Sequence, residues 1–329
     1  MARQIGTTTV RYTLDAVGEP HPTESPVTTA EFNQLIGNFA TDPVGSLTWA
    51  RDALFAISAE QHVPEADRSQ RLSHYLDAYF DLTIKLDQAA FPADAPGTHH
   101  EGIPSYMPDG FVDMGRDPAH DPAKREGEQL WVDKHEILTK YKPLLTRIFE
   151  HDYSDMTPAE RALSMGYSIA REVYQSIPLP KIVDDKGSIG LGGDKVKLSE
   201  ITEALCRHRA LLFQVLSQAV GLNTRVIKGP RMGRKVENHA ANFLQAGDKW
   251  YLFDVSNPYA TDGPDGEQTL LPAAYELEDG PLAPGEARRL SFTRATLLVG
   301  DVSRVRYIAR DDMYWYVEHH TRQATNTNQ

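Results

Sequence analysis

Apolar residues recur at helical spacing over the first half of the chain. Intervals of three and four residues, such as those linking Leu72, Leu76 and Tyr79, are typical of helices with one buried face. They predict helices at five places: residues 30–40, 46–61, 67–91, 130–151 and 158–176. The last of these follows Thr157, a suitable N-cap, and begins with Pro158, which is favoured at the first helical position.

After residue 199 the pattern changes to one helix followed by strands. A helix is predicted over residues 201–220, with Gly221 as the residue that ends it. Alternation of apolar and polar residues then predicts strands at residues 223–229, 239–245, 250–256, 290–300, 302–309 and 313–320. Helices first and strands later predict an α+β fold with a mainly antiparallel sheet.

Stretches rich in proline and glycine suggest how the chain is divided. Residues 1–26 have the composition of a flexible tail with one short strand at Thr8–Leu14. Residues 92–127 are dense in Pro, Gly and Asp, which is long for a loop within a domain, so they form a domain boundary or a functional flap. We therefore expect a helical region over 27–128 and a catalytic domain over 129–329.

A hairpin in the strand region brings two ionisable side chains together. A turn at Gly247-Asp248 pairs Ala246 with Lys249 and, further out, Ala241 with Asp254. Because side chains alternate between faces, His239 and Asp254 then lie on the same face as diagonal neighbours, about 7–8 Å apart at Cα. An imidazole can reach a carboxylate across this distance.

Cys206, the one cysteine of the chain, supplies a nucleophile for this pair. A histidine can hold a thiol as thiolate and imidazolium, and an aspartate can orient that histidine. The sequence therefore predicts Cys206 as nucleophile, His239 as base and Asp254 as orienter. The alternatives are that Cys206 is a small buried hydrophobe, or that His208 is the base. Two helical positions turn His208 about 200° away from the thiol, which argues against it.

Charge and hydropathy narrow the class of protein further. A formal net charge of −12 argues against general nucleic-acid binding, which needs a positive surface. No apolar run is long enough for a membrane helix, and residues 1–26 contain no apolar signal-peptide core. We therefore expect no membrane association, and a protein that is cytoplasmic or exported without a classical signal peptide.

The stretches CRHRALLFQVLSQAVGLNTRVIKG and NHAANFLQAGDKWYLFDVSNP resemble the core of the transglutaminase-like superfamily. In that pattern a Cys opens a helix and a Gly ends it. A strand with Arg and Gly follows, then a strand that starts with His and one that ends in Asp. The matching residues are Cys206, Gly221, Arg225, Gly229, His239 and Asp254. The segment LCRHRALLFQVL is also similar to the regulatory domain upstream of the kinase in plant Raf-like kinases.

The resemblance implies a papain-like fold in which the cysteine helix packs on an antiparallel sheet. It also implies acyl transfer from a peptide or side-chain amide, by a protease or deamidase or by a crosslinking transglutaminase. Some members have lost activity, so a non-catalytic protein-binding module is the alternative. The sequence departs from the family pattern in two places. HAAN stands where HAW is common in the family, and Ser199-Glu200 could begin the helix early enough to leave Cys206 inside it. We expect a break in the helix before Cys206.

Further residues complete the predicted site. The backbone N–H of Cys206 is expected in the oxyanion hole, with Gln175 or the Gly190–Gly193 loop as candidates for the second donor. A basic run in the loop before His239, with Arg231, Arg234 and Lys235, is either a solvated loop or the binding site of an acidic protein or peptide substrate. No cofactor and no metal site are predicted, because His99, His100, Asp117, His120 and Asp121 lie in a loop without a frame for ligand geometry.

Overall fold

The structure, a computed structural model, describes residues 2–5, 8–14, 20–22, 41–43, 45, 64–90, 106–113, 129–178, 195–232, 236–262, 268–277, 287–291, 295–298, 305–308 and 314–318. The predicted helices at residues 30–40 and 46–61 lie outside these ranges. No helix in the described part of the chain is long and apolar enough to cross a membrane.

The long helices follow the apolar periodicity closely. They are α3 (Glu65–Ala90), α4 (Lys134–Lys140), α5 (Lys142–Glu150), α6 (Pro158–Ser176) and α7 (Cys206–Ala219). The helices predicted at 67–91 and 158–176 are confirmed as α3 and α6. At the start of α6, Thr157 Oγ1 accepts the Glu160 N–H, and Glu160 Oε2 accepts the Thr157 N–H at 2.8 Å. This reciprocal capping satisfies two N–H groups at the helix start.

The single helix predicted at residues 130–151 is wrong. The segment begins as a strand, and the helix that follows is broken between α4 and α5 at Tyr141. Pro143 explains the break, because its nitrogen cannot donate to the carbonyl of Thr139 and its ring crowds that carbonyl. Apolar spacing alone does not reveal such an interruption.

Eight strands form one sheet in the order β11-β14-β7-β8-β9-β10-β12-β13, and every neighbouring pair is antiparallel. The strands are β7 (Thr224–Met232), β8 (Val236–Ala246), β9 (Lys249–Asp262), β10 (Gln268–Leu277), β11 (Ala287–Ser291), β12 (Ala295–Leu298), β13 (Val305–Ile308) and β14 (Tyr314–Glu318). The predicted α+β class with antiparallel pairing is confirmed. β10 was not predicted, because Pro272 interrupts its alternation.

Two small sheets lie outside the large one. β1 (Ala2–Ile5), β2 (Thr8–Leu14) and β3 (Pro20–Pro22) pair antiparallel, so the strand predicted at Thr8–Leu14 is confirmed. β4 (Val112–Asp113), β5 (Gln129–Trp131) and β6 (Lys195–Lys197) form the other, in which β5 and β6 are parallel. The predicted division of the chain at residues 26 and 128 stays a prediction.

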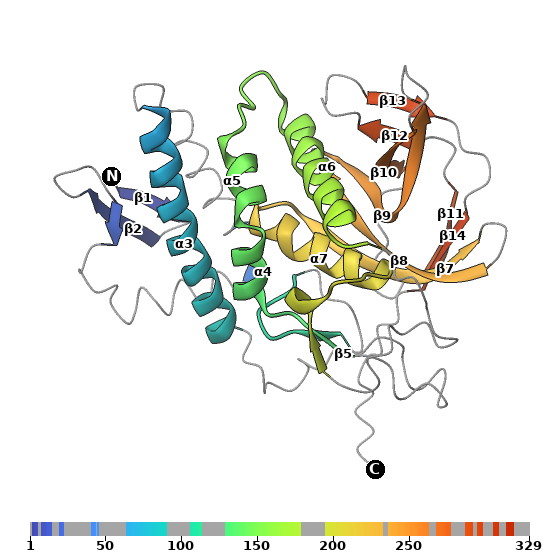
Figure 1. The fold of residues 1–329 in the computed structure, drawn as a ribbon, viewed down its shortest axis with the longest axis horizontal. Coiled ribbons are helices and arrows are strands. Elements are labelled where there is room, and N and C mark those ends of the chain that lie inside the picture. Colours follow the sequence, from blue (N-terminus) through green and yellow to red (C-terminus); the bar gives the residue numbers. More distant parts are fainter. Residues whose placement is uncertain are drawn as a thin grey trace, which may run out of the picture.

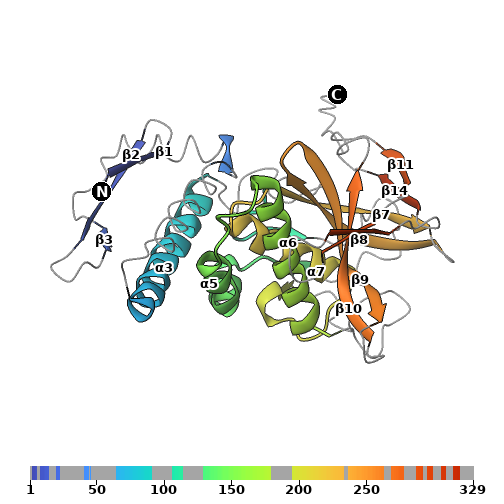
Figure 2. The same cartoon turned by 90° about the horizontal axis from the view of Figure 1, so that it is seen from above.

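The helices form layers on one side of the large sheet (Figures 1 and 2). α6 and α7 pack on β7, β8 and β9, and α3 lies farther out, against α4 and α5. One buried apolar cluster runs through all layers, from Leu76 of α3 through Phe149 of α5 to Phe213 of α7 and Phe253 of β9. The rings of Phe213 and Phe253 stack with centroids 5.4 Å apart.

The approach of α6 to the sheet is unusually close at Gly166. A side-chain carbon placed there would lie 2.6 Å from Leu244 Cδ1 and 3.3 Å from Phe253 Cζ. Glycine is therefore required for α6 to pack at this distance from β8 and β9.

Part of the predicted flap, residues 106–113, packs along α7. The Met107 N–H donates to Gln218 Oε1 at 3.0 Å near the end of α7, and Arg207 Nε lies 3.3 Å from Asp113 Oδ2 near its start. The segment therefore runs opposite to α7 and ends beside the residue that follows Cys206. Residues 91–105 and 114–128 lie outside the described ranges.

Candidate active site

Cys206 is the first residue of α7. A short 3-10 turn at Leu198–Glu200 ends well before it, and Ile201–Leu205 are not helical. The expected break is therefore confirmed. Its cause is visible at Ala204, whose N–H donates to the Pro178 carbonyl at 2.9 Å instead of entering a helix. Cys206 consequently sits at the positive end of the α7 dipole, which favours a thiolate.

The far end of α7 has the termination expected from Gly221. This residue has a φ of 74°, in the left-handed region. The Gly221 N–H donates to the Gln218 carbonyl, and the Leu222 N–H to the Ser217 carbonyl, each at 2.9 Å. These two bonds are a Schellman motif, which closes a helix firmly. Both ends of the cysteine helix are thus fixed by local backbone contacts.

The β8–β9 hairpin has the predicted register. Ala246 pairs with Lys249, and the ladder continues outward to the pair Asn242–Phe253. Gly247 at the turn has a φ of 66°, as a tight hairpin requires. Beyond the last pair, His239 and Asp254 meet, with His239 Nε2 2.9 Å from Asp254 Oδ1. The side chain of Asp254 is fully buried and that of His239 is 6% exposed, so water competes little for this contact.

Asp254 accepts hydrogen bonds from the residues that follow it. The N–H groups of Ser256 and Asn257 both donate to Oδ1 at 3.2 Å, and Asn257 Nδ2 donates to Oδ2 at 2.8 Å. Asn257 Nδ2 also lies 3.0 Å from His239 Nε2. Asn257 was not among the predicted site residues. The Asp-x-Ser-Asn spacing could have indicated it, because Asp side chains commonly accept N–H groups two residues on.

Cys206 completes the group from the helix side. Its thiol hydrogen-bonds to His239, and the backbone N–H of Ala240 donates to the sulfur. Since Nε2 of His239 faces Asp254, Nδ1 is the nitrogen left for the thiol. The structure therefore brings the three predicted catalytic side chains together in the order sulfur, imidazole, carboxylate. Cys206 is partly exposed, as a reactive thiol must be.

These contacts shift the pKa values of Cys206 and His239 in the directions that favour a thiolate and an imidazolium. Burial raises the pKa of Cys206, but the hydrogen bond and charge of His239 and the Ala240 N–H outweigh it, so the pKa is lowered overall. Burial lowers the pKa of His239, while the charge and hydrogen bond of Asp254 and the contact with Cys206 raise it to about 10. Thiolate and imidazolium are therefore favoured together near neutral pH.

Arg209 lies one helical turn below the thiol and is 1% exposed. Its Nη2 donates to the Ile177 carbonyl at 2.6 Å, at the C-terminal end of α6, and its guanidinium stacks 4.7 Å from the Tyr174 ring. Within the described residues, Nε and Nη1 have no hydrogen-bond partner. Its buried charge acts on both Asp254 and Cys206.

His208, the alternative base, has another position. Its Nδ1 accepts the N–H of Leu205 at 2.9 Å, so the ring caps the start of α7. An imidazole that accepts a backbone N–H through Nδ1 in this way stabilises the N-terminal end of the helix. This contact explains why a second histidine follows Cys206 so closely.

Arg231 of the basic run lies in a strand, so the prediction that places it in a loop is wrong. Arg231 belongs to β7, where it pairs with Glu237 of β8 and Trp315 of β14. Arg225 of the same strand stacks its guanidinium 4.9 Å from the Trp250 ring. β7 extends to Met232 because its pairing with β8 continues to the pair Met232–Val236. Arg234 and Lys235 lie outside the described residues.

The structure describes only some of the residues considered for the second oxyanion-hole donor and for a metal site. Gln175 is exposed near the end of α6, and the described contacts do not link it to Cys206. The Gly190–Gly193 loop and the residues of the disfavoured metal site, His99, His100, Asp117, His120 and Asp121, lie outside the described ranges. Within those ranges no group of His, Cys, Asp or Glu could hold a metal ion.

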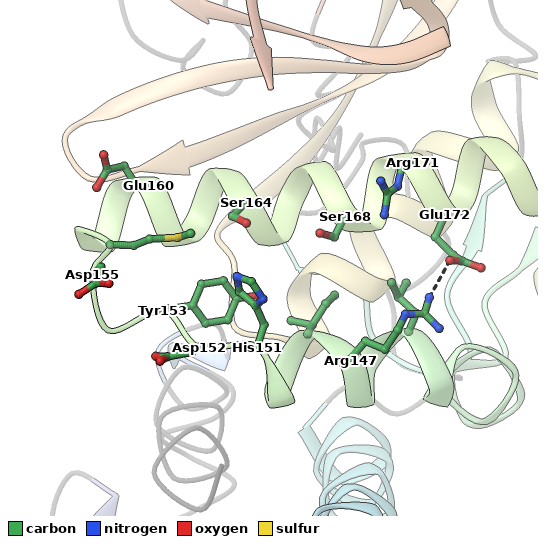
Figure 3. A pocket seen from close by; sticks show the side chains of 13 residues that line it. Arg147, His151, Asp152, Tyr153, Asp155, Glu160, Ser164, Ser168, Arg171 and Glu172 are labelled. Atoms are coloured by element: carbon green, nitrogen blue, oxygen red, sulfur yellow. Dashed lines mark hydrogen bonds and ion pairs between the residues drawn. The ribbon is translucent and has the colours of Figure 1, made fainter. Parts of the chain in front are cut away.

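A separate pocket of about 600 Å³ lies between α5 and α6 (Figure 3). Arg147 and Glu172 form an ion pair of 2.9 Å at one end, and the rings of His151 and Tyr153 meet edge to face at the other. Ser164 and Ser168 of α6 point into it between these ends. Cys206, His239 and Asp254 do not line this pocket.

Comparison with known proteins points to the same part of the chain. Residues 191–258 match the family model "EDR1/CTR1/ARMC3, peptidase-like". A segment of 66 residues is 41% identical to the probable serine/threonine-protein kinase SIS8 of Arabidopsis thaliana. This match covers 20% of the chain and 6% of that kinase, so the chain spans only a small part of its relative. The family match contains Cys206, His239 and Asp254.

Proposed function

We propose that the protein is a cysteine-nucleophile enzyme that transfers the acyl group of a peptide or side-chain amide. One observation carries this proposal: a partly exposed thiol at a helix N-terminus contacts a histidine that a buried aspartate holds by its other nitrogen. The match to a peptidase-like family supports a hydrolytic chemistry, and the packing of α7 on an antiparallel sheet agrees with a transglutaminase-like, papain-like core.

The reaction proceeds in two steps. The Cys206 thiolate attacks the amide carbon, and the imidazolium of His239 gives its proton to the departing nitrogen as the C–N bond breaks. This leaves a thioester on Cys206 and a neutral His239. His239 then takes a proton from water as the water oxygen attacks the thioester, and the thiolate returns as the acid leaves. An amine in place of water gives a crosslinked product; hydrolysis is the outcome that we favour.

Asp254 keeps His239 in the orientation that these steps require. With Nε2–H bonded to the carboxylate, Nδ1 faces the sulfur and can exchange a proton with it. The N–H of Cys206, at the first position of α7, has no acceptor within its own helix and is suited to the developing oxyanion. Arg209 adds a buried positive charge beneath the same turn.

We further propose that the substrate is a protein or peptide with an acidic surface, bound beside β7 and β8. Arg231, Arg234 and Lys235 precede the strand that carries His239. Replacing all three by Ser should raise KM for the substrate at low ionic strength, and salt should abolish the difference. A KM that is unchanged at every salt concentration would reject this binding site.

A non-catalytic binding module is the second candidate. It is favoured by the match to a segment of SIS8, a much longer protein named as a kinase, in which the shared part is 6% of the length. In such a module the contacts of the Cys206 thiol would be retained without a catalytic role. The two candidates differ in the reactivity of Cys206.

Alkylation by iodoacetamide tests the proposed site directly, because Cys206 is the one thiol in the chain. The rate should stay high well below pH 8 and fall only as the pH drops through the lowered pKa of Cys206. As the pH increases towards 10, the alkylation rate should rise further, because His239 loses its proton there and the thiolate loses its partner. His239→Ala should remove the low-pH reactivity. An ordinary thiol profile, unaffected by His239→Ala, would favour the binding module.

The reaction type requires mass spectrometry of proteins treated with wild type or with Cys206→Ala. New peptide termini indicate a protease, a gain of about 1 Da at glutamine or asparagine a deamidase, and linked peptides a crosslinker. Identical products from both proteins would mean that Cys206 is not the nucleophile.

A further inference from the structure

The ladder between β9 and β10 is interrupted directly after Asp254. Asp254 pairs with Ala273 and Tyr259 pairs with Leu271, so residues 255–258 of β9 stand opposite Pro272 alone. Proline has no N–H to offer the neighbouring strand, which suits a break in pairing here. Bulges of this kind redirect side chains and are frequent next to active sites.

The bulge turns three donors onto one carboxylate. The N–H groups of Ser256 and Asn257 donate to Asp254 Oδ1, and the Asn257 amide reaches Oδ2. In a regular strand, successive N–H groups point to opposite sides within the sheet and side chains stand on its faces, so two successive N–H groups would not meet one side chain. The interruption of the ladder therefore creates the cradle that holds Asp254.

Asn257 does more than accompany the bulge, because its side chain bonds the carboxylate that holds His239. One carboxylate oxygen binds His239, and the other binds Asn257 Nδ2 at 2.8 Å, so rotation of the carboxylate would break both bonds. The same amide lies 3.0 Å from His239 Nε2, but both nitrogens carry protons when Nε2 donates to Asp254, so Asn257 acts on the ring through the carboxylate. The carboxylate fixed in this way holds the ring in the orientation that directs Nδ1 towards Cys206.

We propose that Asn257 is a positioning residue that fixes the Asp254 carboxylate and, through it, the tautomer and orientation of His239. This inference rests on the proposed function for its catalytic meaning, although the positioning itself can be measured without it. Arg209 of α7 is another ionised group among the described residues that acts on Asp254 and Cys206. It is unchanged in the variants below.

Two substitutions separate loss of the amide from loss of volume. Asn257→Ala removes both, whereas Asn257→Leu keeps a side chain of similar size without a donor. Asn223→Ala is the matched control, because Asn223 Nδ2 donates to Gln245 Oε1 at 2.7 Å, near the other end of the hairpin. Melting curves establish that each variant is folded before its site is measured.

The first measurement is the pH profile of Cys206 alkylation. In both Asn257 variants the pH at which the rate falls should be about one unit higher, so at a pH below the pKa of the thiol in both proteins they should react about 10-fold more slowly than wild type, and normally above pH 10. Asn223→Ala should keep the wild-type profile. A role confined to stabilising the bulge would lower the melting temperature and leave the profile unchanged, which would overturn the proposal.

The second measurement follows His239 itself by nitrogen-15 NMR, with the signal assigned through His239→Gln. In a Cys206→Ala background, at a pH above the pKa of His239 so that the ring is neutral, His239 should be a single tautomer with the proton on Nε2, and Asn257→Leu should produce a mixture. If wild-type alkylation is that of an ordinary thiol, the proposed function fails, and this spectrum alone decides the positioning role. A tautomer that Asn257→Leu leaves intact rejects it.

Discussion

Two sets of buried ionisable side chains among the described residues can be compared, because both are hydrogen-bonded clusters and they differ in access to solvent. One consists of Asp87 of α3, Tyr106 and Lys134 of α4. Lys134 Nζ lies 2.6 Å from Asp87 Oδ2 and 2.8 Å from the Tyr106 hydroxyl, which donates to Asp87 Oδ1 at 2.8 Å. The other is the Cys206, His239 and Asp254 group.

Shifted pKa values occur in both sets. Burial raises the pKa of Asp87 despite the opposing charge of Lys134, and burial together with the charge of Asp87 raises that of Tyr106. The first set is closed, however: its three members are at most 5% exposed and bond to each other. The second ends in a partly exposed thiol. A perturbed pKa therefore marks a functional site only where one member of the group can meet a substrate.

The largest effect is expected from Asp254→Asn. An amide at this position cannot stabilise the imidazolium and can impose the wrong tautomer on His239, so turnover should fall about 10³-fold or more. Steady-state rates on the substrate found by mass spectrometry measure it. Asp77→Asn is the control, because Asp77 pairs with Lys142 at the surface. A loss below about 10-fold for Asp254→Asn would contradict the orienting role.

Lys134→Met should be the most damaging change to the closed set. It leaves the Asp87 carboxylate buried without its cation, which costs about 3–5 kcal/mol of unfolding free energy. Urea denaturation compares it with Lys142→Met, which breaks an exposed pair between α3 and α5 and should cost about 0–1 kcal/mol. Equal losses of unfolding free energy in the two variants would mean that burial does not make the Lys134–Asp87 pair more important for stability than the Lys142–Asp77 pair.

Tyr106→Phe should have the smallest effect of the three. It removes one donor to Asp87 and one acceptor from Lys134 but keeps their ion pair, so about 1–3 kcal/mol should be lost. Tyr79→Phe, which removes a 2.7 Å bond to the Ala219 carbonyl, is the reference. Neither variant should change the pH profile of Cys206 alkylation while the protein is folded. A changed profile would show that the two sets are coupled.

The hairpin was predictable because its signals are local. Alternation fixes which residues share a face, and Gly247-Asp248 fixes the turn, so the register follows from the sequence. The same reasoning placed His239 near Asp254 without any long-range information. Thr157 and Gly221 were predictable for the same reason, since a helix cap depends on a few adjacent residues.

Features set by contacts between distant segments could not be derived in this way. The start of α7 depends on the bond from Ala204 to Pro178, because Ile201 and Leu205 continue the apolar spacing as if the helix began earlier. The interruption of pairing beside Asn257 lies opposite Pro272, in a strand that was not predicted. The meeting of Cys206 with His239 was expected from the chemistry of a thiol and an imidazole and from family resemblance, since spacing along the chain does not place a helix against a sheet.

Arg209 has a mechanical consequence for the whole helical layer. Its guanidinium bonds the carbonyl of Ile177, the residue that follows α6, and its backbone belongs to the first turn of α7, so one side chain ties these two helix ends together. A substitution that shifts the end of α6 would therefore also act on the turn that carries Cys206.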